Sequence, residues 1–310
     1  RQVSKRWLQF YQADVFTNEP FGGNPLAVFP KAEDLTEREF QQIAREMNLS
    51  ETVFVLPPTD PKAAAKLRIF TPTREIPFAG HPVLGTFYIL GVLKFIELQE
   101  PITHVYYECN LGLFPLEVVV LKGQIDQVIM SQPHPEFLET VKAAEAVYEV
   151  AKALGISKTM ILDHLFPLEI VSTGLPVLIV PLKSLTAVKS IEVNHSLILE
   201  VCSRWGVNGI MAFSSMTVEE NASVHARMFA DPIGIMEDPA TGSAGGALGA
   251  YLVKNGVVEV GPTTEVVIEQ GYEIDRPSRI LVQVFSDDDA IKTIKVGGQV
   301  VMVAEGKILY

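Results

Sequence analysis

Three titratable side chains of this 310-residue chain are of types that could carry acid–base chemistry. Glu51 lies in an apolar segment, His81 follows a glycine, and Asp238 precedes a proline. A carboxyl group against an apolar wall can shuttle protons near neutral pH, and an imidazole changes its charge in the same range. These residues therefore predict general acid–base catalysis, with Glu51, His81 and Asp238 as the catalytic candidates.

Each candidate also has a purely structural interpretation. Glu51 can be a solvated carboxylate at the end of a strand, and His81 can cap a helix or pack beside it. Asp238 can close a turn by accepting hydrogen bonds from backbone N–H groups. The sequence leaves both interpretations open at all three positions.

Two glycine-containing junctions, each followed by an apolar helix, predict an anion-binding site. Gly80 precedes a helix expected over 83–93, and Gly242 and Ser243 precede a second, glycine-rich helix. A helix N-terminus carries partial positive charge and N–H donors without partners inside the helix. We therefore expect Gly80, Gly242 and Ser243 to bind a substrate carboxylate. Ser243 is expected to be an N-cap or a hydrogen-bond donor rather than a nucleophile, because no base stands at a fixed spacing from it.

Signatures of cofactor and metal enzymes are missing from the sequence. We find no GxGxxG, GxxxxGK[ST], HExxH or GxSxG pattern. The two cysteines, Cys109 and Cys202, are far apart and cannot form a disulfide framework or a cysteine-rich metal site. We therefore expect neither a cofactor nor a metal.

Strands and helices that must position these residues follow one another along the whole chain. In the first half, periodicity and turn residues predict strands over 8–16, 26–29, 52–56 and 67–70 and helices over 35–48 and 83–93. In the second half they predict helices over 139–154 and 195–205 and a strand over 209–213. The helix over 83–93 is apolar nearly all the way round, so other elements must enclose it.

The second half of the chain repeats features of the first. Arg227-Met-Phe229 resembles Arg68-Ile-Phe70, and each triplet precedes a glycine-containing junction and an apolar helix. This repetition indicates an internal duplication. We expect an N-terminal half over 1–131 and a C-terminal half over 132–310, with the active site in the cleft between them and a last strand near 292–310 that can return to the first half.

Composition excludes several classes of protein. With 25 Lys and Arg against 37 Asp and Glu, the net charge of −12 disfavours binding to nucleic acids and to anionic membranes. Charged residues make up 20% of the chain and apolar residues 48%, which is typical of a folded globular protein. No apolar run approaches the roughly 18 residues of a membrane span. We expect a cytoplasmic protein with no nucleic-acid or membrane partner.

Five motifs, in this order, resemble those of the PhzF family of phenazine-biosynthesis-like isomerases. They are Phe21-Gly-Gly-Asn-Pro-Leu-Ala-Val28, Asn48-Leu-Ser-Glu-Thr-Val-Phe54, Phe70-Thr-Pro72, Phe78-Ala-Gly-His-Pro82 and Glu237-Asp-Pro-Ala-Thr-Gly-Ser243. Each motif alone is short, but the five in sequence cover nearly the whole chain and are specific together.

The resemblance implies an α+β fold of the diaminopimelate-epimerase type. In this fold two pseudo-symmetric halves each wrap a curved mixed β-sheet around a central buried helix. The resemblance also implies a homodimer and a proton shift along one face of the substrate, as in the isomerisation of trans-2,3-dihydro-3-hydroxyanthranilate, without cofactor or metal. By the matching motifs, Glu51 would shuttle the proton, while His81, Asp238, Gly242 and Ser243 would bind and orient the substrate.

Related racemases of this fold carry a cysteine at each helix N-terminus. Here those places hold Gly80-His81 and Gly242-Ser243, which excludes a two-cysteine mechanism. We therefore expect an isomerase acting on a small, cyclic, unsaturated substrate that bears a carboxylate. Two alternatives remain: a non-catalytic protein that binds small anions or partners, and an epimerase that uses Glu51 and Asp238 on opposite faces of its substrate.

Overall fold

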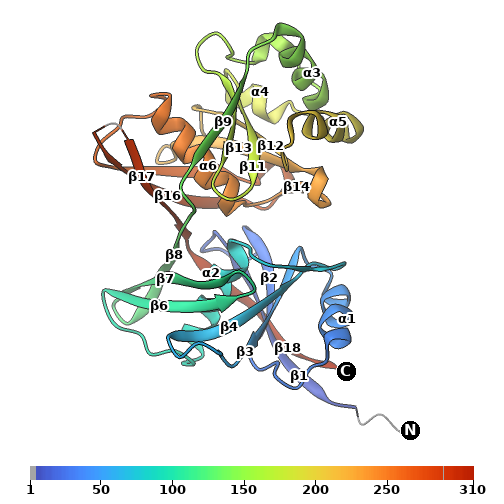
Figure 1. The fold of residues 1–310 in the computed structure, drawn as a ribbon, viewed down its shortest axis with the longest axis vertical. Helices are drawn as coiled ribbons and strands as arrows, with labels where there is room; N and C mark the ends of the chain where they lie inside the picture. Colours follow the sequence, from blue (N-terminus) through green and yellow to red (C-terminus); the bar gives the residue numbers. More distant parts are fainter. Residues whose placement is uncertain (1–4, 289) are drawn as a thin grey trace. The chain divides into compact units, whose positions relative to one another are not determined.

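The computed structural model describes residues 5–288 and 290–310, which form two compact units (Figure 1). Unit 1 comprises the chain up to Met130 together with Gly297–Tyr310, and unit 2 comprises Ser131–Val296. The polypeptide therefore passes from unit 1 to unit 2 and returns to unit 1 for its last strand.

Unit 1 combines a mixed sheet with two helices. Its strands are β1 (Trp7–Val15), β2 (Asn24–Phe29), β3 (Glu51–Leu56), β4 (Ala63–Phe70), β5 (Glu75–Ile76), β6 (Ile102–Cys109), β7 (Gly112–Leu121), β8 (Gln124–Ser131) and β18 (Val300–Leu309), and its helices are α1 (Glu37–Met47) and α2 (His81–Val92). β1 pairs antiparallel with β18 and β2, β2 parallel with β3, and β3 antiparallel with β4. β4 pairs antiparallel with β5 and parallel with β6, and β6, β7 and β8 follow as an antiparallel meander. In Figure 1, β18 (red) accordingly lies beside β1 (blue).

Unit 2 has the same plan with additional helices. Its strands are β9 (Glu136–Val141), β10 (Leu168–Ser172), β11 (Pro176–Pro181), β12 (Ile210–Ser214), β13 (Val224–Ala230), β14 (Ile235–Asp238), β15 (Thr263–Gln270), β16 (Ser278–Asp287) and β17 (Ala290–Gly298). Its helices are α3 (Ala144–Leu154), α4 (Leu185–Lys189), α5 (His195–Trp205) and α6 (Gly242–Lys254), with short 3-10 turns η1 (Lys158–Met160), η2 (Asp231–Ile233) and η3 (Tyr272–Ile274).

The pairing of strands in unit 2 repeats that of unit 1, as the internal duplication predicts. β10 pairs antiparallel with β9 and β11, β11 parallel with β12, and β12 antiparallel with β13. β13 then pairs antiparallel with β14 and parallel with β15, which pairs antiparallel with β16. β9 thus takes the place in unit 2 that β18 takes in unit 1.

The arginine of each repeated triplet makes the same two-point contact with a glutamate of its own unit. Arg68 on β4 donates from Nε and Nη2 to both carboxylate oxygens of Glu75, at 2.8 and 2.7 Å. Arg227 on β13 donates in the same way to Glu237, at 2.8 and 2.9 Å. Such two-point contacts define a planar geometry. Their recurrence aligns the two units residue by residue.

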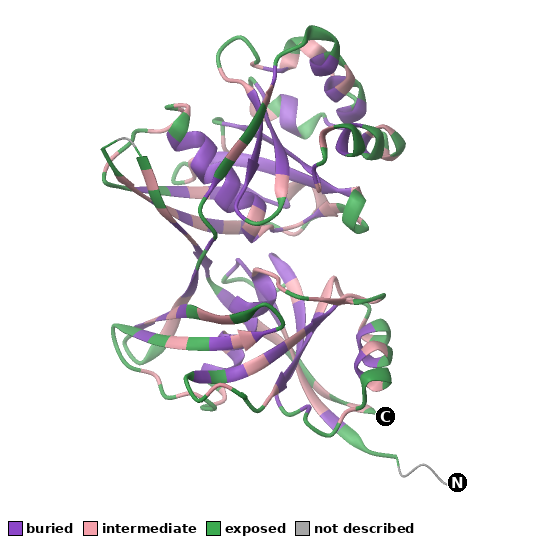
Figure 2. Ribbon diagram, viewed as in Figure 1, coloured by how far each residue is buried: buried purple, intermediate pink, exposed green. Residues whose placement is uncertain are grey.

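A central helix is almost completely buried in each unit (Figure 2). α2 has no polar face, as expected for an enclosed helix, and its residues 81–87 are all buried. α6 is buried at Gly242 and from Ala244 to Val253. Glycine is required on α6 where the sheet comes close, because a Cβ at Gly249 would lie 2.5 Å from Cγ1 of Val282 on β16.

One predicted helix is wrong over its first residues. The helix expected over 139–154 begins only at Ala144, and Glu136–Val141 form β9 instead. β9 pairs with β10, with Val141 opposite Leu168. This pairing supplies backbone hydrogen bonds and a buried site for Val141, which outweigh the local helical pattern.

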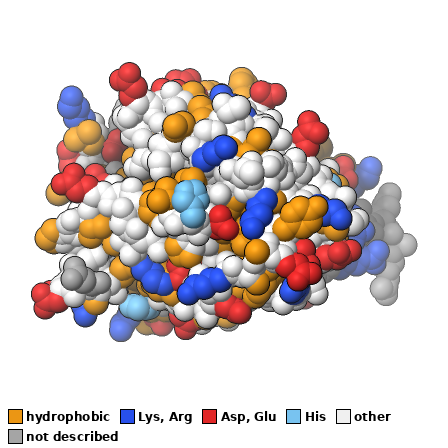
Figure 3. All heavy atoms as spheres, turned by 90° about the horizontal axis from the view of Figure 1, so that it is seen from above, with side chains coloured by type: hydrophobic (Ala, Val, Ile, Leu, Met, Phe, Trp, Pro, Cys, Tyr) orange, Lys and Arg blue, Asp and Glu red, His pale blue; other side chains and the backbone are white. Residues whose placement is uncertain are grey.

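None of the helices in residues 5–288 and 290–310 combines the length and the hydropathy that a membrane span needs. Acidic, basic and apolar side chains are intermixed over the face that Figure 3 presents.

Candidate active site

Glu51, the first residue of β3, stands on a rigid base in unit 1. It pairs with Leu26 of the parallel strand β2. Three residues further on, Phe54 stacks on Phe29 with ring centroids 5.1 Å apart and meets Phe70 edge-on at 5.5 Å. This aromatic packing holds the strand that carries the carboxyl group, and the Glu51 side chain is only 13% exposed.

His81 lies next to Glu51 in the structure, although 30 positions separate them in the sequence. Gly80 is the N-cap of α2 and His81 its first residue, so His81 does not itself cap the helix. His81 Nε2 is 3.4 Å from Glu51 Oε2, and the His81 side chain is 8% exposed. The structure therefore brings Gly80, His81 and Glu51 together at the N-terminus of a buried helix.

His81 is neutral near pH 7. Burial lowers the pKa of His81 to about 3, although a hydrogen bond with the backbone of Pro25 acts in the opposite direction. The contact with Glu51 is thus one between a carboxyl group and an uncharged imidazole, not an ion pair.

Asp238 is the last residue of β14 in unit 2 and is buried. Its Oδ2 accepts a hydrogen bond from Oγ1 of Thr241, so Asp238 does organise a turn, through a side-chain contact. Gln270 Nε2 donates to the backbone oxygen of Asp238 at 2.7 Å and to Thr241 Oγ1 at 3.1 Å. Neither Thr241 nor Gln270 is among the candidates that the sequence predicts. Thr241 belongs to the last of the five motifs, whereas Gln270 carries no local signal.

Gly242 and Ser243 are the first two residues of α6. The N-cap is Thr241, whose side chain makes no capping hydrogen bond, so the prediction of Ser243 as an N-cap is wrong. The Thr241 hydroxyl donates to Asp238 Oδ2 instead of capping the helix. Ser243 remains a candidate hydrogen-bond donor, and its backbone oxygen accepts from Thr173 Oγ1 at 2.9 Å.

Glu51 of unit 1 has no corresponding carboxyl group in unit 2. Arg68 faces Phe54 and Arg227 faces Ala212, so Glu51, three residues before Phe54, corresponds to Gly209. A Cβ at Gly209 would lie 2.5 Å from the backbone oxygen of Phe229, which leaves no room for any side chain there.

Asp238 of unit 2 likewise has no corresponding carboxyl group in unit 1. Glu75 and Glu237 bind the equivalent arginines, and the residues that follow them are Ile76 and Asp238. The duplication therefore produced one distinct carboxyl group per unit, Glu51 in unit 1 and Asp238 in unit 2.

Metal and thiol chemistry find no support among the described residues. Over residues 5–288 and 290–310, no three His, Cys, Asp or Glu side chains are grouped so that they could hold a metal ion. Cys109 and Cys202 are both free and buried. Burial raises the pKa of Cys202 to about 12, so this thiol is protonated at neutral pH.

A pocket of about 870 Å³ in unit 2 lies apart from the candidate residues. His134, Phe137, Lys254 and Lys292 are among the residues that line it. Its lining contains neither Asp238 nor the first turn of α6. The candidate residues of unit 1 lie around the start of α2, and those of unit 2 around the start of α6.

Comparison with known proteins gives a consistent result. The model of the family described as phenazine biosynthesis-like protein matches residues 13–306. A trans-2,3-dihydro-3-hydroxyanthranilate isomerase of Pseudomonas chlororaphis is 35% identical over 300 residues, covering 96% of this chain and 97% of the relative. An uncharacterized isomerase of Clostridium acetobutylicum is 33% identical over 305 residues, covering 98% of this chain and 99% of the relative.

The fold is shared with a solved structure. The crystal structure of the Bacillus anthracis phenazine biosynthesis protein of the PhzF family superposes with a TM-score of 0.89 at 29% identity, covering 98% of this chain and all of that one. The predicted fold class is thereby confirmed, as is the family resemblance carried by the five motifs. The chain belongs to the phenazine biosynthesis-like PhzF family of isomerases.

Proposed function

We propose that this protein isomerises a small, carboxylate-bearing substrate by moving a proton from one carbon to another, with Glu51 as the proton shuttle and without a cofactor. The observation that carries the proposal is the contact of 3.4 Å between Glu51 and a buried His81 whose pKa of about 3 keeps it neutral. A carboxyl group held in such surroundings can take up and return a proton near neutral pH.

The proposed step is a rearrangement that balances without any co-reactant. The Glu51 carboxylate removes a proton from a saturated ring carbon, and the electron pair of that C–H bond moves into the adjacent double bond system. The protonated Glu51 then returns the proton to another carbon, where a new C–H bond forms as the double bond shifts. Substrate and product contain the same atoms at the same oxidation level.

The substrate carboxylate is proposed to bind at helix N-termini. The first turn of α6, at Gly242 and Ser243, offers backbone N–H groups that the Thr241 side chain does not cap. Gly80 offers the equivalent end of α2, where the cap residue has no side chain at all. Carboxylates are stabilised at such ends by the N–H donors and by the helix dipole. His81 and Asp238 are proposed to orient the Glu51 carboxyl group and the substrate, respectively.

The names of two relatives support the proposed substrate class. Proteins of Pseudomonas chlororaphis and Pseudomonas fluorescens, each 35% identical to this chain over 300 residues, are named trans-2,3-dihydro-3-hydroxyanthranilate isomerases. This compound is cyclic, unsaturated and carboxylated, and we propose it as the first substrate to be tested.

Deuterium exchange tests the role of Glu51 directly. The protein is incubated with trans-2,3-dihydro-3-hydroxyanthranilate in deuterated water, and label in substrate and product is followed by mass spectrometry. Glu51→Gln is expected to lower the rate of label incorporation by about 10²–10⁴-fold, since it removes the proton carrier. Glu46→Gln, a matched change on the exposed side of α1, is expected to leave the rate unchanged.

Three other results would point elsewhere. Undiminished exchange in a folded Glu51→Gln protein would eliminate Glu51 as the shuttle. Thermal stabilisation by carboxylic acids without any exchange would indicate a protein that binds anions but does not catalyse. Label that appears with inversion at one carbon, and that depends on both Glu51 and Asp238, would indicate an epimerase.

A further inference from the structure

The turn that joins Asp238 to α6 is held by a side chain from outside it. Gln270, the last residue of β15, is fully buried. Its Nε2 donates to the Asp238 backbone oxygen at 2.7 Å and to Thr241 Oγ1 at 3.1 Å, and its Oε1 accepts from the Thr241 backbone N–H at 3.4 Å. One amide thus contacts both ends of the turn.

These contacts determine the direction of each hydrogen bond. A backbone oxygen can only accept, so the nitrogen of the Gln270 amide must be the atom that faces Asp238. The same nitrogen donates to Thr241 Oγ1, which leaves the single hydroxyl proton of Thr241 to point at Asp238 Oδ2. The carboxylate of Asp238 therefore receives a donor whose orientation is set by Gln270.

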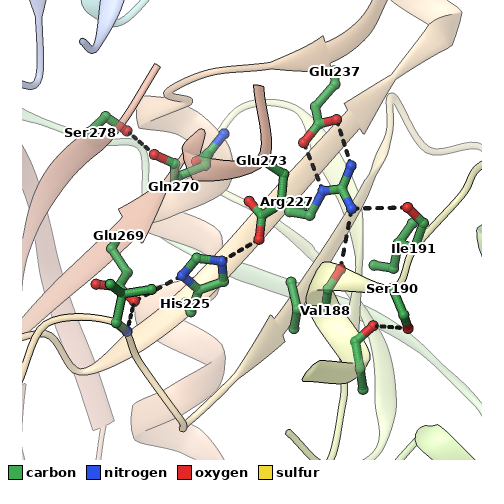
Figure 4. A network of polar contacts seen from close by, with 12 residues as sticks. Val188, Ser190, Ile191, His225, Arg227, Glu237, Glu269, Gln270, Glu273 and Ser278 are labelled. Carbon is green, nitrogen blue, oxygen red and sulfur yellow. Dashed lines mark hydrogen bonds and ion pairs between the residues drawn. The ribbon is translucent and has the colours of Figure 1, made fainter. Parts of the chain in front are cut away.

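Gln270 is itself held by buried polar contacts on both sides (Figure 4). Ser278 Oγ lies 2.9 Å from the backbone oxygens of both Gln270 and Pro239. The preceding residue, Glu269, contacts His225 Nδ1 at 2.8 Å and accepts from the backbone N–H groups of Val218 and Glu219. The side-chain amide is therefore carried by a backbone that is held at Gln270 itself and at the preceding residue, Glu269.

A charged network strengthens this anchor. His225 is fully buried and its second ring nitrogen contacts Glu273 at 2.5 Å. Burial disfavours the charged imidazole, but the hydrogen bonds to Glu269 and Glu273 raise the pKa of His225 on balance. Hydrogen bonds between charged groups in a water-free protein interior are stronger than hydrogen bonds between neutral groups.

We propose that Gln270 is a positioning residue for the reaction and acts through Thr241. By directing the Thr241 hydroxyl at Asp238, it holds the Asp238 carboxylate and the first turn of α6 in the arrangement that the transition state requires. The inference rests on the proposed function, because it assigns a supporting residue to the same chemistry.

A double-mutant cycle tests the path through Thr241. Gln270→Met and Thr241→Val each conserve volume while removing the amide or the hydroxyl. With trans-2,3-dihydro-3-hydroxyanthranilate as the probe, each single variant is expected to lower kcat at least tenfold while KM changes less than threefold. The double variant is expected to fall no more than about threefold below the worse single variant, because both changes break one chain of hydrogen bonds.

Two variants separate positioning from general loss of structure. Thr241→Ser keeps the hydroxyl and is expected to restore kcat to within about fivefold of the unmodified protein. Gln283→Met, the same substitution on the neighbouring strand β16, is expected to have no effect. An unimpaired Thr241→Val protein, multiplicative losses in the double variant, or a Thr241→Ser protein as impaired as Thr241→Val would each overturn the inference.

Hydrogen exchange of the backbone gives a readout that does not depend on turnover. Gln270→Met is expected to speed exchange at the Thr241 and Gly242 N–H groups at least tenfold, and Gln283→Met to leave it unchanged. Equal protection in Gln270→Met and the unmodified protein would refute the inference even if the enzyme were active. Absence of any turnover or label uptake by the unmodified protein would instead refute the proposed function, with the exchange rates still deciding the role of Gln270.

Discussion

At the scale of single residues, the contact between Glu51 and His81 shows how burial decides the charge of a pair. A carboxylate 3.4 Å from an imidazole would ordinarily favour the imidazolium form. His81 is so deeply buried that desolvation dominates and lowers its pKa to about 3. The imidazole of His81 is therefore neutral, and in the mechanism that we propose the proton is carried by Glu51 alone.

The low pKa of His81 predicts a specific dependence of stability on pH. Below about pH 6.5 the unfolded chain binds a proton on this histidine that the folded protein does not bind until about pH 3. The contribution of His81 to the free energy of unfolding therefore falls as the pH drops from 6.5 toward 3. Between pH 7.5 and pH 5.0, the unmodified protein is expected to lose about 2 kcal/mol more unfolding free energy than His81→Gln.

Urea denaturation at the two pH values measures this difference. His164→Gln is the matched control, because it is the same substitution at an exposed histidine. An equal loss of stability in His81→Gln and in the unmodified protein would show that His81 is not held neutral by the fold.

At the scale of elements, the small residues of α6 are required by its packing against the sheet. Seven of its first nine residues are Gly or Ala and most of the helix is buried against the sheet, although glycine lowers helix propensity. At Gly249 the nearest neighbour is Val282 of β16, which is branched at Cβ and therefore stiff. The sheet can wrap α6 closely only because no side chain stands there.

Gly249→Ala is accordingly expected to destabilise the protein by about 1–3 kcal/mol, although alanine is the better helix former. The new Cβ would lie 2.5 Å from Val282 Cγ1, and neither group can move without shifting backbone. Gly245→Ala is the graded comparison, since its Cβ would lie 3.2 Å from Ile280 Cγ2 and a small adjustment suffices. Thermal denaturation of both variants measures the effect, and a Gly249→Ala protein as stable as Gly245→Ala would contradict the packing argument.

At the scale of the whole molecule, the duplicated units differ in how their sheets are completed. β9, which directly follows the crossing into unit 2, pairs with β10. β1 in unit 1 instead pairs with β18, the last strand of the chain, along its whole length from Trp7 opposite Leu309 to Val15 opposite Val300. Unit 2 is therefore continuous in sequence, whereas unit 1 depends on both ends of the polypeptide.

A chain truncated after Val296 is expected to keep unit 2 folded and to lose the fold of unit 1. Removal of β18 exposes the backbone edge of β1 and uncovers the apolar cluster against which Ile308 and Tyr310 pack. Limited proteolysis followed by mass spectrometry should show cleavage across residues 5–130 and protection across 131–296. Equal protection of both segments would contradict this dependence.

A permuted chain provides the control for the truncation. Tyr310 and Arg6 are joined by two backbone hydrogen bonds, of 2.9 and 3.0 Å. Residues 297–310 can therefore precede residue 5 through a short glycine-rich turn and form a hairpin with β1. This chain is expected to recover the protection of unit 1 that the truncation removes.

The sequence by itself determined the chemical inventory, the duplication and the two enclosed helices. The two carboxyl groups, the histidine, the two glycine-containing junctions and the paired triplets at Arg68 and Arg227 are visible because they are local patterns. The polarity of α1 and the apolar character of α2 follow equally from residues close in sequence.

Only the tertiary structure decided which of these groups meet and in what state. Glu51 contacts His81 although 30 positions separate them in the sequence, and Gln270 contacts Thr241 although 29 positions separate those two. β9 forms a strand where the local pattern favours a helix. These outcomes depend on burial and on pairing between distant segments, whose free energies exceed the weak local preferences that a sequence reveals. For the same reason the charge of His81 could be assigned only once its surroundings were known.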